Sequence, residues 1–107
     1  MGEARGKANG ASAARQNWGS VRDNLALSRF ELDADGATAV AYYRIDNGVM
    51  VFTSTQTPPR LRGQGVASEL IRNALEFARA HGLKVQADCS FVADYVDRHP
   101  EFQNLLA

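Results

Sequence analysis

The segment Pro58–Ala67, which reads PPRLRGQGVA, carries the clearest chemistry in this 107-residue sequence. Two prolines and two glycines bracket two arginines, and an apolar-periodic run from Val66 to Ala80 follows directly. The first N–H groups of a helix lack intrahelical partners and lie at the positive end of the helix dipole, so they favour an anion. Gly63 and Gly65 have no side chain to keep that anion from the backbone. The pattern predicts a phosphate-binding loop, and an ordinary Pro/Gly connection without a ligand is the alternative.

A second group of reactive side chains lies near the end of the chain. Cys89 precedes the last expected helix, and a helix N-terminus lowers a thiol pKa from about 8.5. It is either a reactive thiol or a buried structural cysteine. His81 and His99 are expected near helix C-termini, where an imidazole can bond to the last carbonyls, and a role near the bound ligand is the alternative for His99. Two distant histidines and one cysteine do not make a metal-ligand cluster, so we expect no metal site.

Three strands are expected before the loop. Residues 25–33 contain alternation that places Phe30 and Leu32 on one side, which is typical of a half-buried strand. Residues 37–45 and 49–55 form two more, and a short edge strand is expected at residues 21–24. Asp-Gly and Asn-Gly pairs separate the three longer segments and indicate tight hairpin turns. The result is an antiparallel meander.

Two helices and a further strand follow the loop. The run Val66–Ala80 has one apolar face, and Gly82 takes the position after its C-terminus. We expect Arg72 to pair with Glu76 on its polar face. Residues 83–87 then form a strand parallel to the third one, because a helix connects the two. A last helix over residues 91–98 is expected to be capped by Asp88 or Ser90 and stopped by Pro100, with residues 101–107 docked on the core.

Composition restricts the class of protein. The chain is 45% apolar and 22% charged with zero net charge, so it has no general attraction for nucleic acid or an anionic membrane. No apolar run approaches a membrane span. A single cysteine fits a reducing compartment, and we expect a cytoplasmic monomer. Residues 1–18 are small, polar and aperiodic and are expected to form a disordered tail, leaving residues 19–107 as one domain.

The order of meander, loop, helix, strand and helix resembles the GCN5-related N-acetyltransferases, and especially their small single-domain branch. Arg60, Gly63 and Gly65 fit the pattern Arg/Gln-x-x-Gly-x-Gly/Ala of that superfamily's acetyl-CoA loop. The ending from Cys89 through Tyr95 to Phe102 matches the small branch at the same spacing. The likeness spans residues 20–104.

This resemblance implies an α+β fold (an α/β sandwich) whose mostly antiparallel sheet has one parallel strand pair and flanking helices. It also implies that acetyl-CoA is the cosubstrate, that the acceptor is an amine of unknown identity, either a small amine or a lysine side chain, and that CoA enters where the third and fourth strands separate. A backbone N–H of residues 51–55 would polarise the thioester carbonyl. The residues expected at the cofactor are Thr55, Arg60, Arg62, Gly63, Gln64, Gly65, Val66, Ala67 and Phe91.

The resemblance implies catalytic roles for two side chains. Tyr95 would protonate the departing thiolate, or else it is a packed tyrosine. Cys89 would accept the acetyl group covalently or lie beside the CoA sulfur. Glu31, Asp33 and Asp46 are candidate bases, with surface carboxylates as the more ordinary role.

One departure leaves the activity open. Ser54 stands where the small branch usually has a histidine, and Gln56 stands where it has an acid. CoA binding should survive these changes, whereas catalysis depends on what the two residues do in relatives. A CoA-binding module with little catalysis is therefore one alternative, and a protein-interaction domain with a degenerate loop is another.

Overall fold

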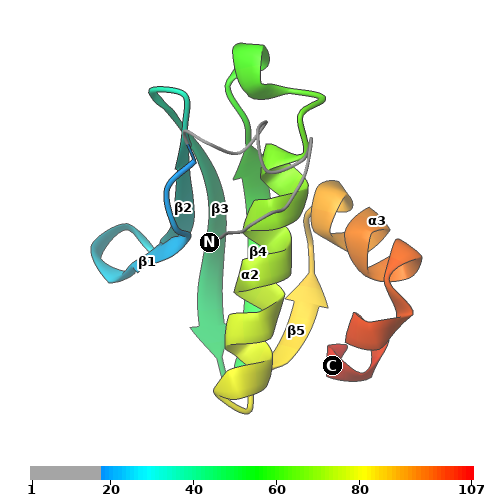
Figure 1. Cartoon of the computed structure of the whole chain (residues 1–107). Helices are drawn as coiled ribbons and strands as arrows, with labels where there is room; N and C mark the ends of the chain where they lie inside the picture. The colour runs from blue at the N-terminus through cyan, green and yellow to red at the C-terminus, as the bar shows by residue number, and fades with distance from the viewer. Residues whose placement is uncertain (1–17) are drawn as a thin grey trace, which may run out of the picture.

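The computed structural model describes residues 18–107, so all but the last residue of the tail expected at residues 1–18 lies outside this range. The described chain forms one five-stranded sheet with the strands in sequence order from β1 to β5 (Figure 1). Trp18 makes an isolated antiparallel bridge to Ala34 of β2. The mixed sheet and its helices confirm the expected α+β fold.

The first four strands are antiparallel neighbours and the last pair is parallel, as predicted. Both hairpin turns use positive φ angles, at Asp35-Gly36 and at Asn47-Gly48, which is the turn geometry that matches strand twist. The strands are β1 (Arg22–Asn24), β2 (Arg29–Ala34), β3 (Ala37–Asp46), β4 (Val49–Gln56) and β5 (Lys84–Ala87).

The strand expected over residues 25–33 begins later than predicted. Leu25–Leu27 is instead a short 3-10 turn, η2. The side chain of Asn24 accepts a hydrogen bond from the backbone N–H of Leu27, and Ser28 has a left-handed φ of 52°. This local capping ends β1 and displaces the start of β2 to Arg29.

Helix α2 (Val66–Ala80) begins and ends where the periodicity predicted. Helix α3 (Ser90–Arg98) begins at Ser90, and its N-cap position is Cys89 rather than Asp88 or Ser90. The predicted pair of Arg72 with Glu76 is also wrong, because Arg72 pairs with Glu69, three residues before it. Two short 3-10 segments complete the chain: η3 (Pro59–Leu61) before the loop and η4 (Pro100–Leu105) after α3.

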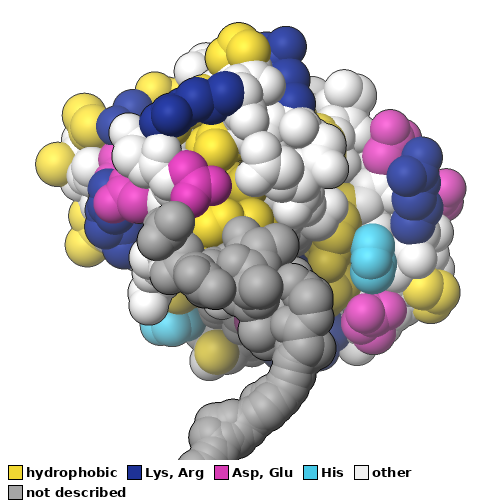
Figure 2. All heavy atoms as spheres, turned by 45° about the horizontal axis from the view of Figure 1, so that its top comes forward, with side chains coloured by type: hydrophobic (Ala, Val, Ile, Leu, Met, Phe, Trp, Pro, Cys, Tyr) yellow, Lys and Arg dark blue, Asp and Glu magenta, His cyan; other side chains and the backbone are white. Residues whose placement is uncertain are grey.

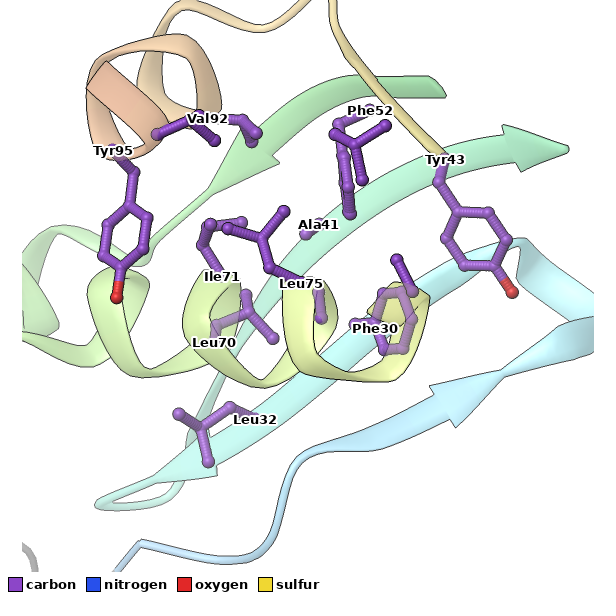
Figure 3. Close-up of a cluster of buried hydrophobic side chains, with 14 of the residues drawn as sticks. Phe30, Leu32, Ala41, Tyr43, Phe52, Leu70, Ile71, Leu75, Val92 and Tyr95 are labelled. Carbon is purple, nitrogen blue, oxygen red and sulfur yellow. The ribbon is translucent and has the colours of Figure 1, made fainter. Parts of the chain in front are cut away.

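The core lies between the sheet and the two helices. Figure 3 shows Leu70, Ile71 and Leu75 of α2 between Phe30 and Leu32 of β2 and the side chains of α3. The C-terminal segment docks on this core as expected. Its buried side chains are Phe102 and Leu105, and the backbone N–H of Ala107 donates to the carbonyl of Val85 on β5.

Candidate functional site

A cavity of about 800 Å³ opens at the end of the sheet where α2 begins. Its size is that of a pocket for a small-molecule ligand. Figure 2 turns this end of the molecule toward the viewer, with dark-blue basic side chains beside uncharged surface. The lining residues are Thr55, Gln56, Thr57, Leu61, Arg62, Gly63, Gly65, Val66, Ala67, Ser68 and Phe91.

Two glycines of the loop line this cavity. Gly63 and Gly65 have φ angles of 80° and 83°, in the left-handed region that a side chain disfavours. The first helical hydrogen bond runs from the N–H of Glu69 to the carbonyl of Gly65, so the N–H groups of residues 66–68 precede the helical ladder. A Cβ added at either glycine would meet no atom within 4 Å. The bend therefore leaves open space in front of the helix N-terminus.

The two arginines of the loop have different surroundings. Arg62 lines the cavity, and its Nε donates to the carbonyl of Thr57 at 3.2 Å. Arg60 donates instead to the carbonyl of Asp35 in the β2–β3 turn, and Gln64 Nε2 donates back to the carbonyl of Arg60. Neither Arg60 nor Gln64 lines the cavity.

The geometry favours a different register for the loop motif. The pattern Arg/Gln-x-x-Gly-x-Gly/Ala also fits Arg62, Gly65 and Ala67, and all three residues line the cavity. In the register expected from the sequence, the first position is Arg60, which is occupied at the β2–β3 turn. The sequence alone allowed both registers because the segment holds two arginines two residues apart.

The cavity continues to the place where two strands separate. The pairing of β4 with β5 ends at Phe52 and Ala87, and the N–H of Asp88 closes it by donating to Phe52. β4 continues to Gln56, so the last four residues of β4 have no strand on that side within residues 18–107. Thr53 is also an extra residue on β4, because Tyr42 pairs with Ser54 while the adjacent Tyr43 pairs with Phe52. A bulge of this kind is frequent beside active sites.

Cys89 lies beside this separated end of β4. Its Sγ is 3.4 Å from Oγ1 of Thr55, a residue that lines the cavity. Partial burial by itself would raise the pKa of the thiol. The Thr55 hydroxyl and the backbone N–H groups of Val92 and Phe91 at the start of α3 outweigh burial and lower the pKa of Cys89 below its ordinary value. The result is a thiol with increased thiolate character.

Tyr95 lies on a small adjoining cavity of about 140 Å³. Ser68 and Phe91 line both cavities. The Tyr95 hydroxyl points toward the first turns of α2 in Figure 3 and has no hydrogen-bond partner among residues 18–107. Burial raises the pKa of Tyr95, so the hydroxyl stays protonated at neutral pH. The ring stacks on His99 with centroids 3.8 Å apart.

Both histidines have structural roles that the sequence anticipated. The Nδ1 atoms of His81 and His99 lie 2.9 Å and 2.7 Å from the carbonyls of Phe77 and Tyr95, four residues earlier in each case. Among residues 18–107 no group of three histidine, cysteine or acidic side chains is placed to hold a metal ion. No helix in this range is long and apolar enough to cross a membrane.

The sequence profile of the GCN5-related N-acetyl-transferase family matches residues 29–105, which include every residue of the site described above. This match covers most of the chain. The chain belongs to the GCN5-related N-acetyltransferase family.

A solved relative supports this assignment. The solution structure of a GCN5-like protein from Staphylococcus aureus superposes with a TM-score of 0.65 at 27% sequence identity. The alignment covers 82% of this chain and 87% of that one. The two proteins therefore share the whole domain rather than an isolated motif.

The acetyltransferase fold brings together most of the residues that the sequence proposed. Thr55, Arg62, Gly63, Gly65 and the first turn of α2 meet Phe91 around one cavity, and Cys89 touches it through Thr55. Three further lining residues, Thr57, Leu61 and Ser68, were not expected from the sequence. Ser68 could have been predicted from the sequence, because the third residue of a helix has an N–H outside the helical ladder. Leu61 and Thr57 could not have been predicted in this way, because the path of the loop depends on the docking of η3.

The candidate carboxylates do not lie on the cavity. Glu31 was expected at the surface, and this is wrong: only 3% of its surface is exposed. Its carboxylate accepts hydrogen bonds from Arg29, Asn24 and Arg22, which lower its pKa. Asp33 pairs with Arg22, and Asp46 is exposed at the opposite end of β3. Among the three candidates, none is placed to act as a base in the cavity.

Proposed function

We propose that this domain binds acetyl-CoA and transfers the acetyl group to an amine. The observation that carries the proposal is one continuous cavity, which joins the exposed N-terminus of α2 to the end of β4 that has separated from β5 beside Cys89. Phosphate groups suit the first end because of its N–H groups and Arg62. An extended amide chain suits the second end because the edge of β4 offers backbone hydrogen bonds.

The chemistry assigns three tasks to the residues of the chain. Backbone N–H groups near the bulge at Thr53 polarise the thioester carbonyl. The amine nitrogen attacks that carbonyl, a C–N bond forms and the C–S bond breaks. The Tyr95 hydroxyl gives its proton to the departing thiolate, and the amine releases its proton to water. Cys89 lies next to the CoA sulfur or first takes the acetyl group itself. The single cysteine also fits action in the reducing cytoplasm.

A second candidate is a CoA-binding domain with little catalysis. It is favoured by Ser54 and Gln56, which occupy the end of β4 where relatives of the small branch carry a histidine and an acid. Neither a serine nor a glutamine can take a proton from an amine at neutral pH. Rate measurements with acetyl-CoA and a panel of amines distinguish the two candidates.

CoA binding is tested by titration followed through backbone amide shifts. The expected shifts are at Gly63, Gln64 and Gly65, and their absence at millimolar CoA would exclude both candidates. Gly65→Glu should abolish binding because it places a bulky anion against the phosphates. Gly48→Glu is the matched control, since Gly48 has a φ of 78° and equally open surroundings but lies in the β3–β4 turn. Equal CoA affinities in the two variants would contradict the phosphate assignment.

The role of Cys89 is tested separately by mass spectrometry after incubation with acetyl-CoA. A covalent route predicts an acetyl adduct on Cys89 and loss of transfer in Cys89→Ala. Proximity alone predicts no adduct and retained transfer in that variant.

A further inference from the structure

A second recess, of about 380 Å³, lies at the same end of the sheet as the cofactor cavity. Gln56 and Thr57 line both hollows, so they are neighbours on the two sides of the end of β4. Directly paired residues of adjacent strands point to the same face of a sheet. Gln56 pairs with Val40, and Val40 pairs with Glu31, which places the recess on the face opposite α2. Its lining is Arg29, Thr38, Val40, Gln56, Thr57 and Pro58.

Arg29 is held in place at this recess. Its Nε donates to Oε2 of Glu31 at 2.5 Å, and its Nη1 donates to the hydroxyl of Tyr42 at 2.8 Å. The guanidinium also lies 5.6 Å from the centre of the Tyr42 ring. The remaining nitrogen, Nη2, has no hydrogen-bond partner among residues 18–107. Arg29 therefore presents one oriented pair of N–H donors without a further loss of side-chain freedom on binding.

The charge balance of the recess favours an anion. Its lining has one cation and no carboxylate. Two carboxylates bond to lining residues, and both are already partnered. Glu31 accepts bonds from Arg22, Asn24 and Arg29 and is closed off from solvent, and Asp33 accepts bonds from Arg22 and Thr38. A protonated amine would face Arg29 without a counter-ion, whereas a carboxylate would gain a charge-assisted hydrogen bond.

The recess also lies in line with the reactive end of β4. Arg29 pairs with Tyr42, and Tyr42 pairs with Ser54, the residue after the bulge. These three residues therefore stand in one row across the sheet. We propose that the recess binds a carboxylate of the acetyl acceptor through Arg29, so that the acceptor is an amino acid or a peptide with a nearby carboxylate. This inference rests on the proposed acetyl transfer.

The test uses N-acetylglycine as a product-like probe, with the neutral N-acetylglycinamide as its match. Each is titrated into the full chain with and without saturating CoA and followed by amide shifts. N-acetylglycine should shift Thr38, Val40 and Thr57, and the amide should bind at least about tenfold more weakly. Arg29→Gln should lower the affinity for N-acetylglycine by a similar factor. Arg44→Gln, an exposed arginine of β3 outside the recess, should bind it as the unaltered protein does.

Several outcomes would overturn the inference. They are equal binding of the two probes, shifts away from the recess, or unchanged affinity in Arg29→Gln. If Arg29→Gln does not fold, Thr38→Glu serves instead. It should also lower the affinity for N-acetylglycine, because it adds a negative charge to the lining. An N-acetylated tripeptide with a free carboxylate distinguishes the two possible acceptors, a free amino acid and a peptide. Binding as tight as that of N-acetylglycine indicates a peptide, and weaker binding indicates a free amino acid.

The two proposals fail in different ways. Missing CoA shifts at Gly63–Gly65 reject the acetyl transfer, and the recess then loses its assignment as the acceptor site even if N-acetylglycine binds. CoA shifts without recess shifts reject only the carboxylate site.

Discussion

Arg60 and Arg62 show how far two nearly adjacent side chains can differ. Arg60 reaches back to the carbonyl of Asp35, while Arg62 lines the cavity at the N-terminus of α2. Arg60 lies within the 3-10 turn η3, and Arg62 follows the buried Leu61 at the end of that turn. Because the turn sends the two side chains in different directions, one arginine serves the loop and the other can serve a ligand.

This difference predicts opposite outcomes for two alanine substitutions. Arg62→Ala should lower the affinity for CoA by about tenfold, because a charge-assisted contact to phosphate is lost. Arg60→Ala should leave CoA affinity within a few-fold and instead lower the free energy of unfolding slightly, since its contact is exposed. Calorimetric titration of CoA measures the first effect and urea unfolding the second. A larger loss of affinity in Arg60→Ala would return the motif to the register first expected.

Tyr95 and Tyr43 provide a second comparison of single residues. Both are 8% exposed, but Tyr43 donates to Asp23 at 2.6 Å, whereas the Tyr95 hydroxyl has no partner among residues 18–107. Tyr95→Phe should therefore leave stability almost unchanged and reduce acetyl transfer by about 10²–10⁴-fold. Tyr43→Phe should cost about 0.5–1.5 kcal/mol of stability without changing transfer. If Tyr95→Phe retained full transfer, its role as the proton donor would be excluded.

At the scale of elements, the strand β4 separates the cavity at the N-terminus of α2 from the recess at Arg29. Alternation places Thr55 toward α3 and Gln56 toward the opposite face. The cavity at the N-terminus of α2 and the recess at Arg29 therefore lie on either side of one strand. The network around Glu31 supports the recess, because it joins β1 and β2 and orients Arg29.

This network predicts how stability depends on pH. Hydrogen bonds from Arg29 and Asn24 lower the pKa of Glu31 in the folded state, and those from Arg22 and Thr38 lower that of Asp33. A lowered folded pKa means that the stabilisation is complete above the unfolded values of 4.5 and 3.8 and is lost as pH falls through the folded values. Glu31→Gln should be less stable at neutral pH and lose less stability on acidification. Urea unfolding over this pH range measures both effects.

Glu76→Gln is the matched control for this prediction. Glu76 pairs with Arg79 on the exposed face of α2, so its loss should change stability little at any pH. The same acid dependence in Glu31→Gln as in the unaltered protein would contradict the role given to the network.

At the scale of the whole molecule, the C-terminal segment completes the core behind the site. Phe102 is 2% exposed and packs against Tyr95, and Ala107 bonds to β5. The segment thereby holds α3, with Cys89 at its start, against the sheet. The positions of Cys89 and Tyr95 depend on residues that do not line either cavity at the site.

Two phenylalanines test this arrangement. Phe102→Ala should lower the free energy of unfolding by about 3–5 kcal/mol, because it leaves a large void in a close-packed core. Phe91→Ala should change stability little, since Phe91 is 36% exposed. It should lower the affinity for CoA, because the ring lines the cavity. Thermal unfolding and CoA titration of both variants check these expectations. A stable Phe102→Ala variant would show that the segment is not required to hold α3.

The sequence by itself determined what depends on local periodicity and turn chemistry. The bounds of α2, the two hairpins and the glycine loop follow from interactions between residues close in the chain, and the order of elements then restricts the topology. Only the tertiary structure decided which arginine faces the cavity, that Glu31 is buried, and that Arg29 and Gln56 share a recess. The first property depends on how η3 docks, and the other two depend on strand register, which brings together residues far apart in sequence. No local pattern encodes the direction in which a long side chain finds its partner.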